Sequence, residues 1–179
     1  MKADFVGLFL AACFISLSAC ASLPATGQCE DNWQITGYYT PVEGDFSGPR
    51  QTINIADHGR NSFALAFLRE VKMEGWGKTR DGWYLGYYSV GWHRAEQPQD
   101  ATGQPLVVGT AAVDPKVNIG QRLYIPAFRQ WLNSGNFEAR DVGGRIAKRH
   151  IDLYTGEGQS ARKLTWRITG NQTVCLIES

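Results

Sequence analysis

Three aspartates next to turns are the side chains of this sequence best suited to acid–base chemistry. Asp114 lies in A-V-D-P-K, Asp141 in A-R-D-V-G-G and Asp152 in H-I-D-L-Y. Strand ends and turns are where a rigid scaffold presents reactive groups. A carboxyl group held among apolar neighbours and near a second carboxylate has a raised pKa, which a general acid needs at neutral pH. Each aspartate also has a structural interpretation, because Asp114 and Asp141 could cap turns and Asp152 could simply point outward from a strand.

The chain around these aspartates is expected to form short strands. Apolar residues between turn residues predict strands over 33–39, 82–89, 106–113, 121–125, 137–141, 151–154, 164–168 and 173–177. Helical spacing predicts one helix over 63–75, with Asn61 and Ser62 as N-cap residues, and short helical turns over 126–132 and 159–163. No repeat or linker divides the chain, which predicts one mainly β domain closed as a barrel.

Composition narrows the possible partners. With 43% hydrophobic and 20% charged residues, the 179-residue chain can bury a core, which excludes a disordered tail or a coiled coil. Lys and Arg number 18 against 17 Asp and Glu, and no basic run concentrates them, so nucleic acid is not an expected partner. The sequence has no His-x-x-His or Cys-x-x-Cys pair, and we expect no metal and no cofactor.

The N-terminal residues are typical of export. Residues 5–17 form an apolar run that is too short to span a bilayer and suits a signal peptide. The tetrapeptide L-S-A-C ending at Cys20 resembles a bacterial lipobox; cleavage for soluble secretion and a retained segment are the alternatives. We expect a signal peptide over 1–19, a linker over 20–32 and the barrel over 33–179. The mature protein is expected to be a periplasmic lipoprotein anchored through Cys20, in the outer membrane rather than the inner.

The cysteines of the mature chain predict a disulfide. Cys13 lies in the signal peptide and Cys20 in the lipobox, which leaves Cys29 and Cys175 at opposite ends of the domain. In an oxidising compartment two such cysteines are expected to pair. Two buried free thiols are the alternative.

Two long segments resemble a known family. They are G-T-A-A-V-D-P-K-V-N-I-G-Q-R-L-Y-I-P and, after it, A-R-D-V-G-G-R-I-A-K-R-H-I-D-L-Y-T-G. Both are similar to the three-aspartate (3D) domain of bacterial cell-wall proteins, a family related to the membrane-bound lytic transglycosylases A. Upstream, T-G-Y-Y-T-P over 36–41 and M-E-G-W-G-K-T-R-D-G over 73–82 resemble that group's opening motif and its Q-G-S-G-R segment.

The resemblance implies a fold and an activity. The fold is a six-stranded double-psi β-barrel with one or two short helices. The activity is non-hydrolytic cleavage of the MurNAc-β-1,4-GlcNAc bond of peptidoglycan, which leaves 1,6-anhydro ends. By motif, Asp152 would be the acid/base, Asp141 its neighbour in the cleft, and Asp114 the first of the three aspartates, with Lys116 beside it. A non-catalytic glycan-binding barrel and a glycoside hydrolase are the alternatives, and we expect a monomer.

Further substrate contacts are expected from residues in or near the same motifs, namely Tyr38, Tyr39, Glu74, Trp76, Gly143 and Gly144. Trp76 stands where the family has a small Ser, so it could narrow the cleft or offer a stacking face. The larger transglycosylases carry a second domain between the two upstream motifs, whereas here only residues 42–73 separate them. The second wall of the saccharide groove is therefore expected to be missing.

Overall fold

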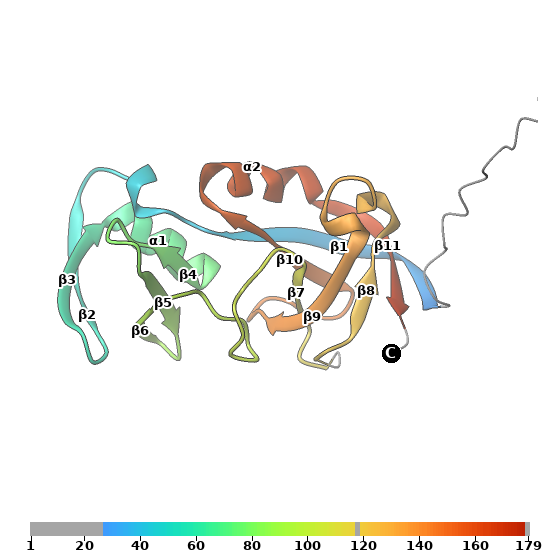
Figure 1. Cartoon of the computed structure of the whole chain (residues 1–179), viewed down its shortest axis with the longest axis horizontal. Helices are drawn as coiled ribbons and strands as arrows, with labels where there is room; N and C mark the ends of the chain where they lie inside the picture. Colours follow the sequence, from blue (N-terminus) through green and yellow to red (C-terminus); the bar gives the residue numbers. More distant parts are fainter. Residues whose placement is uncertain (1–26, 117–118, 178–179) are drawn as a thin grey trace, which may run out of the picture.

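The computed structural model describes residues 27–116 and 119–177, which form two sheets. One is a closed six-stranded barrel in the order β1-β10-β7-β9-β8-β11, and the other is a five-stranded sheet in the order β3-β2-β6-β5-β4. Figure 1 shows the five-stranded sheet at one end of an elongated molecule and the barrel at the other. The six-stranded barrel that the resemblance implies is confirmed.

The barrel is assembled from both ends of the chain. Its strands are β1 (Gly27–Thr40), β7 (Thr110–Val113), β8 (Arg122–Tyr124), β9 (Asn136–Val142), β10 (His150–Glu157) and β11 (Gly170–Ile177). Strand β1 begins within the expected linker and pairs with β10 in parallel and with β11 antiparallel. Short 3-10 turns lie at Glu43–Asp45, Pro126–Phe128 and Asn133–Gly135.

The chain between β1 and β7 forms the second sheet. The expectation that residues 33–179 form a barrel alone, with no second wall to the saccharide groove, is therefore corrected. The strands of the second sheet are β2 (Arg50–Ile55), β3 (Gly59–Ala64), β4 (Trp76–Lys78), β5 (Tyr84–Tyr88) and β6 (Gly91–Ala95). The β2–β3 hairpin is hard to predict from the sequence, because only Ile53 and Ile55 alternate on β2 and the apolar residues of β3 are confined to its end, at Phe63 and Ala64. Few buried positions suffice there because only one face of this hairpin packs on a core.

Helix α1 (Leu65–Glu74) confirms the expected helix, but its start differs. Residues 63–64 still belong to β3, and Ala64 stands at the N-cap without a side-chain hydrogen bond. The expected capping by Asn61 and Ser62 is therefore wrong. Both residues are paired with β2 instead.

Helix α2 (Gly158–Ile168) replaces the strand expected over 164–168. The local alternation of Leu164 to Ile168 imitates a strand, but the buried residues Ala161, Thr165 and Ile168 recur at helical spacing. This face packs on β1, where a Cβ on Gly37 would stand 2.9 Å from the Cα of Thr165. The close approach places α2 against the strand that carries Thr36 and Tyr38.

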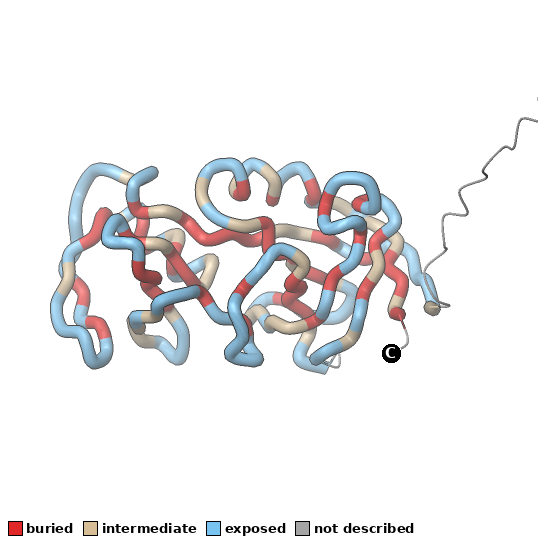
Figure 2. The backbone as a smooth tube through the Cα atoms, viewed as in Figure 1, coloured by how far each residue is buried: buried red, intermediate tan, exposed pale blue. Residues whose placement is uncertain are grey.

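Two hydrophobic cores and a junction hold the molecule together. The barrel core includes Ile35, Ala111, Ile151 and Leu153, and a second core lies between α1 and the five-stranded sheet. A third cluster joins the two units through residues of both, including Tyr38, Trp76, Tyr84, Ala112 and Tyr154. Figure 2 shows the buried segments continuing from one unit into the other. The relative position of the two sheets is thus fixed by packing.

Cys29 and Cys175 face each other on β1 and β11 and are joined by a disulfide, as the sequence predicts. The expected signal peptide and Cys20 lie outside the described residues. Within residues 27–116 and 119–177, no helix has the length and apolar character needed to cross a membrane.

Candidate active site

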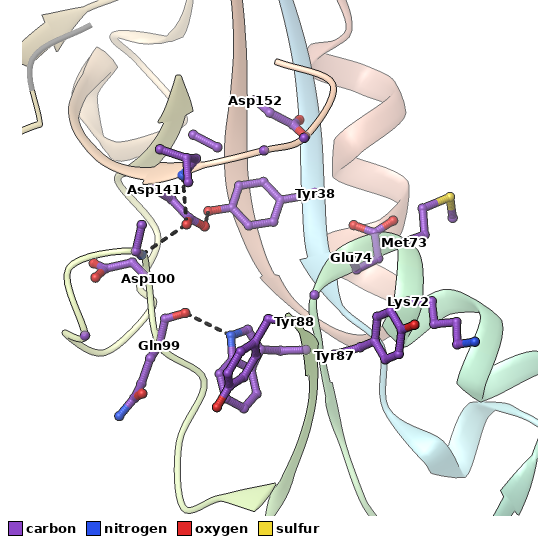
Figure 3. A pocket seen from close by; sticks show the side chains of 18 residues that line it. Tyr38, Lys72, Met73, Glu74, Tyr87, Tyr88, Gln99, Asp100, Asp141 and Asp152 are labelled. Carbon is purple, nitrogen blue, oxygen red and sulfur yellow. Dashed lines mark hydrogen bonds between the residues drawn. The ribbon is translucent and has the colours of Figure 1, made fainter. Parts of the chain in front are cut away.

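A cleft of about 630 Å³ lies between the barrel and the five-stranded sheet. Its floor comes from the barrel strands, and its opposite wall comes from the end of α1 and from β4 and β5. Figure 3 shows the cleft with Tyr38, Asp141 and Asp152 on the barrel side. The residues that line it are Tyr38, Lys72, Met73, Glu74, Gly75, Trp76, Tyr87, Tyr88, Gln99, Asp100, Ala101, Gly103, Ala112, Asp141, Val142, Gly143, Gly144 and Asp152.

Strand register places two aspartates on either side of one alanine. Asp152 on β10 pairs with Ala112 on β7, and Ala112 pairs with Asp141 on β9. Paired residues share a face of a sheet, and adjacent strands are about 4.8 Å apart, so the two aspartate Cα atoms are about 10 Å apart. Ile151 and Leu153, the neighbours of Asp152, point into the barrel core. Asp152 therefore points away from that core, into the cleft.

Within the described part of the chain, the carboxyl group of Asp152 accepts a hydrogen bond at one oxygen. Thr36, its partner on β1, donates its hydroxyl to Oδ1 at 2.7 Å, and His150 Nε2 lies 2.8 Å from the same hydroxyl. Since the hydroxyl proton goes to the carboxylate, His150 donates to Thr36. Burial raises the pKa of Asp152, Thr36 and His150 lower it, and the charge of Asp141 raises it. The net direction is upward, as a general acid requires.

Asp141 is held by three donors. Tyr38 donates its hydroxyl to Oδ2 at 2.8 Å, and the backbone N–H groups of Val142 and Ala101 donate to Oδ1 at 2.9 and 3.1 Å. Burial and the charge of Asp100 raise the pKa of Asp141, these donors oppose the rise, and the net direction is upward. Burial and the same carboxylate raise the pKa of Tyr38 well above its usual range, so this hydroxyl keeps its proton. Asp141 is thus an acceptor whose oxygens are occupied.

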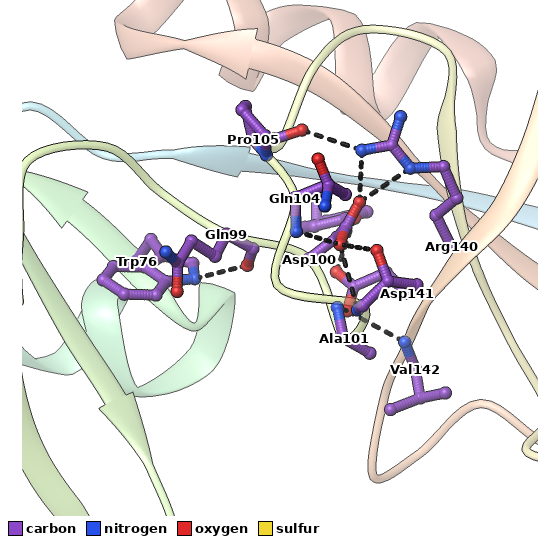
Figure 4. A network of polar contacts seen from close by, with 11 residues as sticks. Trp76, Gln99, Asp100, Ala101, Gln104, Pro105, Arg140, Asp141 and Val142 are labelled. Atoms are coloured by element: carbon purple, nitrogen blue, oxygen red, sulfur yellow. Dashed lines mark hydrogen bonds and ion pairs between the residues drawn. The ribbon is translucent and has the colours of Figure 1, made fainter.

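Hydrogen bonds and an ion pair hold the loop between β6 and β7 next to Asp141 (Figure 4). Asp100 is buried and accepts the guanidinium of Arg140, with Nε at 2.8 Å. Asp100 also accepts the backbone N–H groups of Thr102 and Gln104, and Trp76 donates its indole N–H to the carbonyl of Gln99 at 2.8 Å. These bonds hold the loop where the N–H of Ala101 meets Asp141.

Glu74 stands at the C-terminal end of α1, across the cleft from the barrel floor. Its Oε2 accepts the backbone N–H of Tyr39 at 3.1 Å. Burial raises the pKa of Glu74 to about 7, and the charges of Asp152 and Glu70 add to the rise. Tyr39 itself is buried and donates its hydroxyl to Glu70 at 2.8 Å.

Aromatic rings form the remaining wall. Tyr88 is 47% exposed and stacks on His93 with ring centroids 3.9 Å apart, so its ring is available to a ligand. Trp76 is only 8% exposed, and its ring centroid lies 5.7 Å from that of Tyr88. Trp76 therefore narrows the cleft and supports Tyr88 more than it offers a free stacking face.

The cleft brings together seven of the ten residues expected to catalyse or to contact substrate, and leaves out three. Tyr38, Glu74, Trp76, Gly143, Gly144, Asp141 and Asp152 line it, whereas Tyr39, Asp114 and Lys116 do not. Asp114 instead caps its turn by accepting the backbone N–H groups of Lys116 and Lys148 at 3.0 and 2.7 Å, which lower its pKa. The turn-cap interpretation of Asp114 thus fits the structure.

Sequence reasoning missed several residues of the site. Thr36 and Ala112 are recognisable only from strand register, and Asp100 only from its pairing with Arg140. The turn-rich run Q-P-Q-D-A-T-G was the one available signal for this loop. Among the described residues, no group of three or more His, Cys, Asp or Glu is placed to hold a metal ion.

Comparison with known proteins points to one group. The family model of the 3D domain matches residues 109–178. No curated protein matches the sequence.

Solved structures match across both sheets. E. coli MltA with bound chitohexaose has a TM-score of 0.64 at 18% identity, covering 83% of this chain and 72% of that one. The membrane-bound lytic murein transglycosylase from Agrobacterium tumefaciens gives 0.57 at 14% identity, covering 80% and 73%. MltA from Neisseria gonorrhoeae gives 0.53 at 15% identity, covering 80% and 72%. The sequence of residues 109–178 is therefore similar to the 3D domain, and the described chain has the fold seen in the MltA structures.

Proposed function

We propose that the protein is an exported peptidoglycan lytic transglycosylase that cleaves the MurNAc-β-1,4-GlcNAc bond and leaves 1,6-anhydro ends. The observation that carries the proposal is the unequal hydrogen bonding of the two carboxyl groups beside Ala112. Burial raises the pKa of both, but Asp152 has one oxygen without a hydrogen bond among the described residues, whereas Asp141 is held by three donors. The chitohexaose bound to E. coli MltA supports an amino-sugar glycan as the ligand of this fold.

Asp152 acts as the single acid and base. Its protonated carboxyl gives the proton to the bridging oxygen as the bond to C1 of the muramic acid breaks. The resulting carboxylate then takes the proton of the C6 hydroxyl while O6 bonds to C1. This closes the anhydro ring without water and returns Asp152 to its protonated form. Positioned acid–base catalysis of this kind contributes about 10² to 10⁴-fold to a rate.

Asp141 supports this chemistry without exchanging a proton. Its oxygens are occupied by Tyr38, Val142 and Ala101, so it is poorly placed to activate water as the base of a hydrolase would. Its charge helps to keep Asp152 protonated and favours the positive charge that develops at C1.

The test is digestion of purified sacculi, with the released ends identified by mass. The wild-type protein should release anhydro-muropeptides, and Asp152→Asn should lose at least about 10²-fold in rate with an unchanged fold. Asp141→Asn should lose less and move the alkaline limb of the pH profile to lower pH, because it removes a charge that raises the pKa of Asp152. Asp81→Asn is the matched control, because it removes one carboxylate from an exposed turn outside the cleft.

The outcomes separate three functions. Reducing ends would indicate a hydrolase, and intact binding without products would indicate a glycan-binding barrel. A well-folded Asp152→Asn protein that released anhydro ends at the wild-type rate would overturn the assignment of the acid.

We further propose that a signal peptide over 1–19 directs export and that Cys20 carries a lipid anchor in the periplasm, in the outer membrane rather than the inner. The lipobox-like tetrapeptide supports this. Replacing Cys20 with Ser should release the protein from the membrane fraction or stall its processing. Unchanged fractionation and mature mass would contradict the anchor.

A further inference from the structure

We propose that Lys72 binds a carboxylate carried by the glycan, so that the cleft selects acidic glycans and fixes their orientation. The proposal rests on the proposed function for the site and adds to it the chemical class of the substituent that is recognised. No motif of the sequence singled out Lys72; its place in the cleft comes from the fold.

Lys72 is held by two aromatic rings in the last turn of α1. Its Nζ lies 4.8 Å from the ring centroid of Tyr87 and 5.5 Å from that of Trp92, and the two rings lie 4.7 Å apart. An ammonium group over ring faces is attracted by their π electrons. The two rings therefore hold the ammonium group of Lys72 in place. They do not accept its N–H groups as a carboxylate would, so these donors can still bind a ligand.

The charge of Lys72 is not neutralised within the part of the chain that the structure describes. The ion pairs there involve other cations, and no carboxylate oxygen lies within 4.0 Å of Lys72 Nζ. Lys72 is exposed, so a ligand in the cleft can reach it. These two properties suit binding better than a purely structural role.

The distribution of charge in the cleft gives Lys72 a directional role. Lys72 is the only cationic residue among those that line the cleft, against the four acids Glu74, Asp100, Asp141 and Asp152. Arg140 pairs with Asp100, Asp141 and Asp152 lie at the barrel floor, and Glu74 lies on α1, two residues from Lys72. Figure 3 shows Lys72 at the α1 side and Asp141 at the barrel side. An anionic substituent is repelled from the floor and attracted to the α1 side, which orients the sugar above Asp152.

Peptidoglycan offers this carboxylate from two sources. Muramic acid without its peptide carries a free lactyl carboxylate, whereas muramic acid with its peptide carries carboxylates further along the stem. Chitohexaose carries neither. These three ligands therefore distinguish the recognition of a carboxylate from the recognition of the sugar backbone.

The test measures binding in an Asp152→Asn background, so that no ligand is cleaved. Calorimetry gives the affinities for three ligands: chitohexaose, peptide-free glycan and peptide-bearing glycan. These affinities are compared between the protein that keeps Lys72 and its Lys72→Met and Lys72→Arg variants. Lys72→Met should weaken binding of at least one carboxylate-bearing glycan about fivefold, an effect that shrinks at high salt. Lys72→Arg should retain most of the affinity, and chitohexaose binding should not change.

The control is Lys163→Met, which removes an exposed lysine of α2 outside the cleft and should change none of the affinities. A loss confined to peptide-free glycan identifies the lactyl carboxylate, and a loss confined to peptide-bearing glycan identifies the stem peptide. Equal losses for all three ligands, or no loss for any, would overturn the proposal. Failure of the lytic activity itself appears separately, as missing anhydro ends in the sacculus digest of the wild-type protein.

Discussion

Replacing Glu74 with Gln should stabilise the protein at alkaline pH far more than at acidic pH. The pKa of Glu74 is about 7 in the folded chain against an ordinary value of 4.5, because burial disfavours its charged form. Between these two values the unfolded chain has lost the proton while the folded chain keeps it. The stability that the protonated group contributes is complete below 4.5 and is lost as the pH rises through 7.

The magnitude follows from the two pKa values. The linkage between proton binding and folding means that Glu74 lowers the unfolding free energy of the wild type by about 3 kcal/mol at pH 8 and by about 1 kcal/mol at pH 5. Gln is neutral at both pH values and can still accept the N–H of Tyr39. The difference in unfolding free energy between Glu74→Gln and the wild type should therefore increase by about 2 kcal/mol from pH 5 to pH 8.

The assay is urea unfolding at pH 5 and pH 8, followed by tryptophan fluorescence. Subtracting the unfolding free energy of the wild type at each pH removes the contributions of Asp141 and Asp152, because both proteins contain these residues. Glu138→Gln serves as the control, because Glu138 is exposed on β9 outside this cleft and its replacement should give the same small difference at both pH values. The reasoning is refuted if the Glu74→Gln difference is also independent of pH.

Three further predictions concern the acid, the disulfide and the helix contact. Thr36→Val removes the donor that stabilises the ionised form of Asp152, so the alkaline limb of the muropeptide-release profile should move to higher pH; a shift to lower pH would contradict the role of Thr36. Reducing the Cys29–Cys175 bond, which closes a loop with a sequence separation of 146, should lower the unfolding free energy by about 5 kcal/mol in urea titrations; an unchanged midpoint would exclude this contribution. Gly37→Ala places a Cβ 2.8 Å from Ile168 Cδ1 and should destabilise the protein by about 1 to 3 kcal/mol, and an unchanged melting temperature would contradict this close packing.

The sequence predicts the barrel better than the rest of the fold. The strands around Asp141 and Asp152 stand out because buried residues such as Ile151 and Leu153 alternate with polar ones over several positions. The β2–β3 hairpin lacks that signal, since its exposed face leaves few apolar residues to count. In α2, five residues with strand-like alternation outweighed the helical spacing of Ala161, Thr165 and Ile168, which only a longer window reveals.

The resemblance predicts which residue types form the site and gives each aspartate an expected role, but it does not show which of them lie together. The strand pairing shows that. Asp141 and Asp152 flank Ala112, whereas Asp114 lies after the end of β7 and turns back to cap its own loop. A residue's neighbours across a sheet depend on register, which a single sequence does not specify.

The contrast between Asp141 and Asp152 depends on a loop that neither residue belongs to. Arg140 on β9 pairs with Asp100 in the loop. The residues that follow them in the sequence also meet, since Asp141 accepts the backbone N–H of Ala101. The ion pair fixes the loop, and the loop supplies one of the three donors that occupy Asp141. Asp152, among the residues that the structure describes, has a hydrogen bond at Oδ1 alone and lines the cleft. The buried Asp100–Arg140 pair thus positions the loop that gives Asp141 a donor, and the proposed roles of the two aspartates rest on this difference.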